Sequence, residues 1–84
     1  MPLKVDYKAS VEKDLKRISH SARGKILNLI ESDLAEDPAA KGERLTGKWA
    51  GMWRYEVRPY RVIYAILGDS ILIVRIGHRK DVYR

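Results

Sequence analysis

Residues 53–76, WRYEVRPYRVIYAILGDSILIVRI, decide the fold of this chain. Aromatic and β-branched residues dominate them, as in strands. Gly68-Asp69 is typical of a tight hairpin, and Pro59 predicts a less regular turn earlier on. Three strands are therefore expected, at about Met52–Arg58, Tyr60–Leu67 and Ser70–Ile76.

The residues before this stretch predict one strand and two helices. Leu3–Tyr7 alternates apolar and polar side chains, as a short strand does. Ser10 is a candidate cap for a first helix that is expected to end near Ser19-His20, and Ser21 is a candidate cap for a second. The apolar stripes of the two helices are Val11, Leu15 and Ile18, then Ala22, Ile26, Leu29, Ile30 and Leu34. Residues 37–51 have no sustained period and are interpreted as a connecting loop, with Pro38 beyond the second helix.

This order of elements predicts an α+β fold. An antiparallel two-helix hairpin is expected to pack on one face of a mostly antiparallel sheet of about four strands. The 84 residues allow one domain, residues 1–84. The absence of cysteine excludes disulfides and thiolate metal sites. No apolar run approaches the roughly 20 residues of a membrane helix, and the amino terminus has no signal-peptide core, so a cytoplasmic protein without membrane contact is expected.

Alternation along the strands predicts which side chains the helices cover. The apolar set that needs this cover is Trp53, Tyr55, Val57, Tyr60, Val62, Tyr64 and Ile66. Arg54, Glu56, Arg58 and Arg61 then lie on the uncovered face, together with Ile63 and Ala65. On the last strand, Leu72, Val74 and Ile76 are expected to point opposite to Ile71, Ile73 and Arg75.

Positive charge is concentrated in the strand-rich half. Residues 43–84 hold nine Lys and Arg against four Asp and Glu, whereas residues 1–42 hold eight against seven. Such an excess indicates a polyanionic partner, nucleic acid first. Guanidinium groups match phosphate oxygens in geometry as well as charge. The alternatives are that the charge only keeps a small protein soluble, or that each arginine forms an ordinary surface salt bridge.

Several motifs together resemble the RelE family of the RelE/ParE toxin superfamily. They are Leu45-Thr46-Gly47, Trp53-Arg54, Tyr60-Arg61-Val62-Ile63-Tyr64 and Ile76-Gly77-His78-Arg79-Lys80-Asp81-Val82-Tyr83. The resemblance implies the toxin of a type II toxin–antitoxin pair. It implies a metal-independent endoribonuclease, without a cofactor, that cuts messenger RNA in the ribosomal A site by attack of the 2′-hydroxyl on the adjacent phosphate. The implied partners are the ribosome, mRNA and a cognate RelB-like antitoxin.

The resemblance also implies roles for individual residues. Arg61 matches the arginine that holds the scissile phosphate, and Arg79 the arginine that protonates or stabilises the leaving oxygen. Tyr83 matches the tyrosine that stacks on or orients the substrate nucleotide. Arg54 falls where the family often has the first of two lysines. The second lysine position is Glu56, which is a departure from the pattern.

Two residues are candidates for the general base that the 2′-hydroxyl requires. Glu56 is one, and its alternative role is a salt bridge that holds Arg54 or Arg61 in place. His78 is the other, because its unperturbed pKa lies near neutrality, and its alternative role is that of a loop histidine beside Arg79.

Two other functions remain open on the sequence. One is a ParE-like toxin on the same fold, which poisons DNA gyrase and cleaves no RNA. The other is a nucleic-acid-binding or partner-binding module without catalysis. The catalytic hypothesis requires Arg61 and Arg79 to converge on the uncovered side of the sheet.

Overall fold

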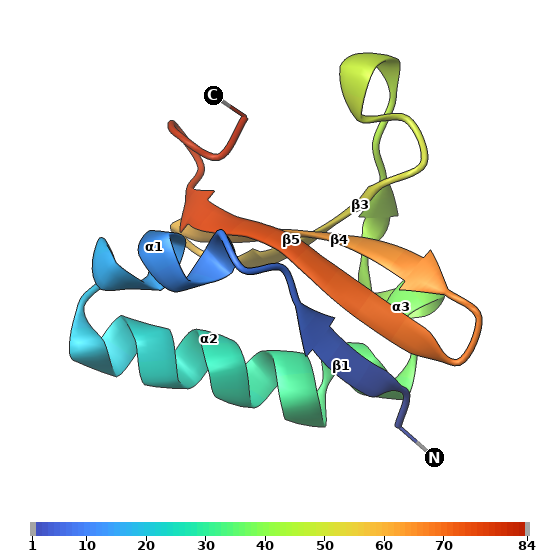
Figure 1. The fold of residues 1–84 in the computed structure, drawn as a ribbon, viewed down its shortest axis with the longest axis horizontal. Helices are drawn as coiled ribbons and strands as arrows, with labels where there is room; N and C mark the ends of the chain where they lie inside the picture. Colours follow the sequence, from blue (N-terminus) through green and yellow to red (C-terminus); the bar gives the residue numbers. More distant parts are fainter. Residues whose placement is uncertain (1, 84) are drawn as a thin grey trace.

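The computed structural model describes residues 2–83. Its helices lie on one side of a sheet with the strand order β1-β5-β4-β3-β2 (Figure 1). The strands are β1 (Lys4–Tyr7), β2 (Glu43–Arg44), β3 (Trp53–Val57), β4 (Tyr60–Leu67) and β5 (Ser70–His78). β1 runs parallel to β5, and the other neighbours are antiparallel. The predicted α+β class is confirmed. The two-residue strand β2 is an addition to the four strands expected.

The two main helices are α1 (Val11–Lys16) and α2 (His20–Ser32), which run antiparallel (Figure 1). The first helix is shorter than predicted. The cap of α2 is Ser19, whose side chain accepts a hydrogen bond from the Ala22 amide at 3.3 Å, so the prediction of Ser21 as the cap was wrong. Within residues 2–83, no helix has the length and apolar character needed to cross a membrane.

The segment expected to be a plain loop contains short ordered elements. They are the 3-10 turn η1 (Leu34–Glu36), the helix α3 (Pro38–Lys41), β2 and the 3-10 turn η2 (Gly47–Trp49). Asp37 caps α3 through a 3.2 Å bond from the Ala40 amide. The turn that carries η2 projects beyond the sheet on the side away from the helices, as does the C-terminal segment (Figure 1). Both therefore belong to the open side.

The main core lies between the helices and the sheet, as alternation predicted. Of the expected set, Tyr55, Val57, Val62 and Tyr64 are buried in it, and Trp53, Tyr60 and Ile66 pack against it partly buried. The hydroxyl groups of the tyrosines find partners at the edge of this core: Tyr55 donates to Asp33 at 2.6 Å. This bond, followed by one from Lys41, lowers the pKa of the Asp33 carboxyl.

The last strand departs from simple alternation because β5 contains a bulge. Tyr64 pairs with Ile73 but Ile63 pairs with Arg75, so Val74 is an extra residue on β5. As a result, Ile73 and Ile76 both reach the helix-side core. The prediction that Ile71 and Ile73 lie opposite to Ile76 was therefore wrong.

The open face is also less exposed than expected at Ile63. This residue is fully buried, although it is absent from the helix-side core. The turn that follows β5 lies above the open face (Figure 1), and its Val82 is also buried. Val82 packs on Gly77, where an added Cβ would meet the Val82 Cα at 3.6 Å. The contact of Val82 with Gly77 thus anchors the C-terminal segment on β5.

Gly42 supplies a stability prediction. A Cβ at this position would lie 1.8 Å from the Tyr64 hydroxyl oxygen, which is buried and donates to the Pro38 carbonyl at 2.6 Å. Gly42→Ala is therefore expected to lower the free energy of unfolding by about 1–3 kcal/mol, as overpacking does. Gly24→Ala is the matched control, because nothing lies within 4 Å of its Cβ inside α2. The free energy of unfolding of the Gly24→Ala protein should rise by roughly 0.5–1 kcal/mol. Urea denaturation measures both, and equal midpoints would contradict this packing.

Candidate active site

The centre of the candidate site is a cross-strand pair on the open face. Glu56 of β3 lies directly opposite Arg61 of β4, and the Glu56 Oε1 is 3.3 Å from the Arg61 Nε. The same oxygen is 3.7 Å from the Arg54 Nε, and the other carboxylate oxygen is 3.6 Å from the Arg58 Nε. Strand alternation places Arg54 and Glu56 on the same side, as predicted, and Arg58 reaches the same carboxylate from the β3–β4 turn. One carboxylate therefore faces three guanidinium groups.

A second acid, Glu43, also binds this cluster. Its carboxylate accepts a hydrogen bond from the Arg54 Nη2 across the β2–β3 pairing. The three guanidinium groups of Arg54, Arg58 and Arg61 then face the two carboxylates of Glu43 and Glu56, which leaves one positive charge in excess. Sequence analysis did not select Glu43 as a site residue, because β2 has only two residues and the sequence does not show that they pair with β3.

Burial makes two of these arginines unlike ordinary surface charges. The side chains of Arg54 and Arg61 are 24% and 23% exposed, against 88% for Arg58. The Nε atoms of Arg54 and Arg61 are buried and have no hydrogen-bond acceptor within the described residues. Glu56 lies at ion-pair distance from both but lacks hydrogen-bond geometry. Partial burial reduces solvent screening, so these charges act more strongly on a bound anion.

Arg79 joins Arg61 and Glu56 at one pocket. The Arg79 amide donates to the Pro59 carbonyl at 3.0 Å, which ties the residue after β5 to the β3–β4 turn. A pocket of about 290 Å³ is lined by Glu56, Arg58, Pro59, Tyr60, Arg61 and Arg79. Arg61 and Arg79 thus converge on one open cavity, which is the geometry that the catalytic hypothesis requires.

Tyr83 lies on the same face, beside Arg54 and Trp49. Contact with the Tyr83 hydroxyl, and then with Glu43, raises the pKa of Arg54 above its usual value. The Tyr83 ring meets the Trp49 indole edge to face, with 5.7 Å between ring centroids. It remains 37% exposed. Trp49 was missed as a site residue, although a tryptophan between Gly47 and Gly51 was a signal available in the sequence.

His78 occupies a different pocket. Its Nδ1 accepts a hydrogen bond from the Lys80 amide at 3.2 Å. Its ring meets the edge of Tyr60, with 6.0 Å between centroids. The second pocket, of about 230 Å³, is lined by Asp14, Arg17, Ile18, Tyr60, Arg75, Ile76, Gly77, His78, Asp81 and Val82. His78 is therefore not at the Arg61–Arg79 pocket, whereas Glu56 is.

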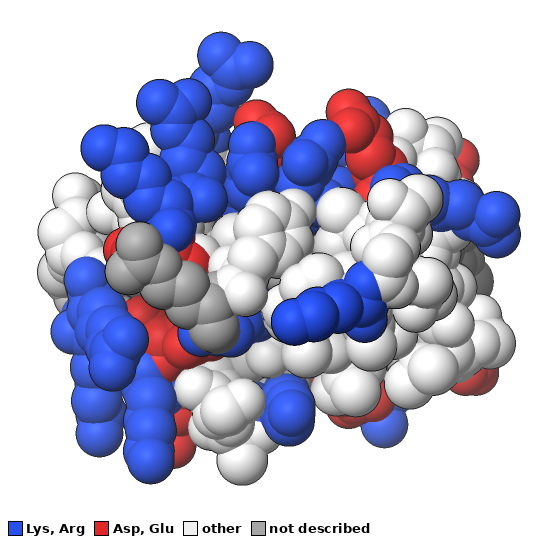
Figure 2. All heavy atoms as spheres, turned by 90° about the horizontal axis from the view of Figure 1, so that it is seen from above, with Lys and Arg blue, Asp and Glu red and all other residues white. Residues whose placement is uncertain are grey.

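The wider surface is basic. Figure 2 shows the molecule from above Figure 1, the side away from the helices, and Lys and Arg cover much more of this view than Asp and Glu. Within the described residues, no three His, Cys, Asp or Glu side chains gather as metal ligands would. The open face thus combines excess positive charge, a pocket lined by arginines and an exposed tyrosine. Such a surface can bind and polarise a phosphodiester.

The fold is shared with known toxins. The structure of the RelBE2 toxin–antitoxin complex from Mycobacterium tuberculosis is similar with a TM-score of 0.88 at 23% identity, covering 94% of this chain and 100% of that chain. The RelB–RelE antitoxin–toxin complex from Methanococcus jannaschii gives 0.71 at 25% identity, covering 93% and 94%. The YoeB/ParE toxin from Agrobacterium tumefaciens gives 0.72 at 23% identity, covering 92% and 99%.

The sequence itself identifies the family. A comparison with curated proteins finds no match. The model of the ParE toxin of type II toxin–antitoxin systems, parDE, matches residues 5–83. The chain belongs to this family of toxins within the RelE/ParE superfamily. The predicted membership of the superfamily is confirmed.

Proposed function

We propose that this toxin is a ribosome-dependent endoribonuclease that cuts mRNA in the A site and so inhibits translation. The observation that carries the proposal is the convergence of Arg61 and Arg79 on the pocket that Glu56 also lines. A surface that only attracted nucleic acid would need positive charge, but it would not need two arginines that line the same pocket. The expected place of action is the cytoplasm, where ribosomes and mRNA are found.

The proposed reaction uses groups of the chain and of the RNA. The 2′-oxygen attacks the adjacent phosphorus in line, and the bond from phosphorus to the 5′-oxygen breaks. The products are a 2′,3′-cyclic phosphate and a 5′-hydroxyl. Glu56 is the better placed base for the 2′-hydroxyl proton, because it lies within the pocket and His78 does not. The leaving oxygen takes up a proton, and Arg79 donates it or stabilises the charge.

The arginines act mainly through charge. Negative charge grows on the phosphorane oxygens and on the leaving oxygen, and guanidinium groups that are already in place stabilise it without reorganisation. Arg61 holds the scissile phosphate, and Arg54 adds a second, partly buried charge nearby. Glu43 and Glu56 hold Arg54, since both contact it. Tyr83 is exposed on the same face and orients the nucleotide by stacking.

The partner that restrains this activity is a separate antitoxin. Two of the similar structures are complexes of a toxin with its antitoxin. A RelB-like antitoxin with acidic residues would complement the basic face of this chain. Its binding there would block entry of the RNA.

The experiment that tests the function is translation in vitro with toeprinting on a defined message. We expect truncated messages whose 3′ ends follow the phase of the codons and appear only when ribosomes translate. An intact message at inhibitory toxin concentrations would contradict the proposal.

A second candidate is supported by the family model, whose description names ParE. On this alternative the toxin poisons DNA gyrase and leaves RNA uncut. A supercoiling assay with purified gyrase distinguishes the two. Inhibited supercoiling together with an intact message would establish the ParE-like action.

A further inference from the structure

A small pocket beside Tyr83 is not used by the chemistry proposed above. It has a volume of about 320 Å³ and is lined by Lys8, Ser10, Asp14, Trp49, Val74 and Arg75. This volume is at the lower end of the range of small-ligand sites. Trp49 connects the two sites, because its indole lines this pocket and also meets the Tyr83 ring.

The bulge in β5 builds the floor of this pocket. β1 ends its pairing where Tyr7 meets Ile73, and the Lys8 amide donates to the Ile73 carbonyl at 2.9 Å. Beyond that point Val74 is the extra residue, and both Val74 and Arg75 line the pocket. Regular alternation would have sent these two neighbours to opposite faces. Bulges often re-aim side chains beside functional sites in this way.

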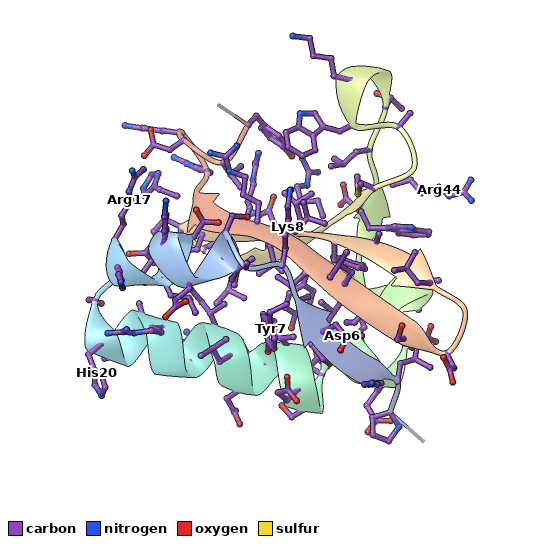
Figure 3. The ribbon with its side chains drawn as sticks, in the orientation of Figure 1. Asp6, Tyr7, Lys8, Arg17, His20 and Arg44 are labelled. Carbon is purple, nitrogen blue, oxygen red and sulfur yellow. The ribbon has the colours of Figure 1, made fainter. Side chains whose placement is uncertain are left out.

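The walls of the pocket differ in chemistry. The Trp49 indole and Val74 provide apolar surface, and Trp49 is only partly buried. Lys8 is exposed and extends from the end of β1 toward the open side of the sheet (Figure 3). Asp14 also lines the pocket, but its Oδ2 accepts a 3.1 Å bond from the Ile76 amide. Because a carboxylate repels phosphate, a phosphate is favoured at Lys8 rather than beside Asp14.

We propose that this pocket is a second nucleotide subsite, in which a base of single-stranded RNA stacks on Trp49 while its phosphate binds Lys8. The inference rests on the proposed function and extends its substrate contacts beyond the nucleotide at Tyr83. An aromatic platform flanked by cations is the usual way to hold single-stranded nucleic acid, because every base has a π-face. The subsite would bind the nucleotide next to the one that Tyr83 orients.

Fluorescence of Trp49 tests the stacking directly. The chain has two tryptophans, so Trp53→Phe leaves Trp49 as the only reporter. Trp53 packs on the helix-side core and stacks on Tyr64, away from the proposed subsite. The probe is a short single-stranded 2′-O-methyl RNA, which lacks the nucleophile and is not cut. We expect the RNA to quench the fluorescence of Trp49 until the site is saturated. Unchanged Trp49 fluorescence at saturating RNA would overturn the proposal.

Variants test the binding contribution. By anisotropy of a labelled 2′-O-methyl RNA, Trp49→Ala should weaken binding about 5- to 150-fold, the usual range for one stacked base. Trp49→Phe should retain most of the affinity. Lys8→Ala should weaken binding and reduce its salt dependence. Lys4→Ala is the matched control, because Lys4 is an exposed lysine at the other end of β1 that does not line the pocket. Unchanged binding by Trp49→Ala would overturn the subsite and would leave Trp49 as a support for Tyr83.

Different results would contradict the proposed nuclease activity and the proposed Trp49 subsite. If the message is cut but Trp49→Ala binds RNA as tightly as the unaltered protein, the subsite is wrong and the nuclease stands. If RNA quenches Trp49 but no message is cut, the nuclease is wrong and the subsite stands as an RNA-binding site. Arg61→Ala should lose cleavage and should need a higher RNA concentration to reach the same quenching of Trp49, because Arg61 binds a phosphate but does not line this pocket.

Discussion

Arg61→Ala is expected to abolish detectable mRNA cleavage and the arrest of growth that follows from it. Loss of one pre-placed charge donor typically costs about 2.7–4 kcal/mol in the transition state, or roughly 10²–10³ in kcat. Arg61 is expected to reach this range because its side chain is largely shielded from solvent and its pocket also contains Arg79. Single-turnover cleavage on programmed ribosomes measures the effect.

Two further variants separate the role of Arg61 from simple loss of charge. Arg58→Ala removes the same charge from the same carboxylate partner, but its side chain is 88% exposed. It should therefore change the rate far less. Arg61→Lys retains the charge without the fork of guanidinium donors, and an intermediate rate is expected. A folded Arg61→Ala protein, checked by circular dichroism and thermal melting, that still cleaves would remove Arg61 from the mechanism.

Glu56→Gln is expected to lower single-turnover cleavage more than His78→Gln does. General base catalysis contributes about 10²–10⁴ in rate. Glu56 lies in the Arg61–Arg79 pocket, whereas His78 lines another pocket and its Nδ1 is occupied by the Lys80 amide. The two glutamine variants are matched, because each replaces a titratable group with the same amide. The reverse ranking would make His78 the better candidate base.

The pH dependence then distinguishes the two roles of Glu56. If Glu56 is the base, its loss should remove the acidic limb of the pH profile of the single-turnover rate. If it only holds Arg54 and Arg61, the limb should remain while RNA binding weakens. The 3.3 Å and 3.7 Å contacts to these arginines are the structural basis of the second role.

The sequence predicted the fold well because its strongest signals are local. Alternation along residues 53–67 correctly assigned the core face, since one face of each strand had to be buried. The α+β architecture followed from the order of the elements. The bulge at Val74 was not predictable from alternation, because it depends on how β5 pairs with β4 and β1. The burial of Ile63 was also not predictable, because alternation assigns this residue to the open face but does not show what covers it there.

The site was predictable only in part. Arg61, Arg79 and Glu56 were selected from motifs, and the structure brings them to one pocket. Their catalytic roles stay predictions. Glu43 and Trp49 were not selected, because each reaches the site through a contact between distant segments: Glu43 through the two-residue strand β2, and Trp49 through the C-terminal Tyr83. Such contacts leave no periodic signal in a single sequence.

The most direct test of the central claim is a titration with a single RNA linkage. The claim is that the guanidinium groups of Arg61 and Arg79 bind the same phosphodiester. A 2′-O-methyl dinucleotide contains one such linkage, and NMR of the arginine Nε–H groups, assigned with Arg→Lys variants, follows each guanidinium. We predict that the Arg61 and Arg79 resonances shift together with one dissociation constant. Movement of only one of them, or two different constants, would contradict the account.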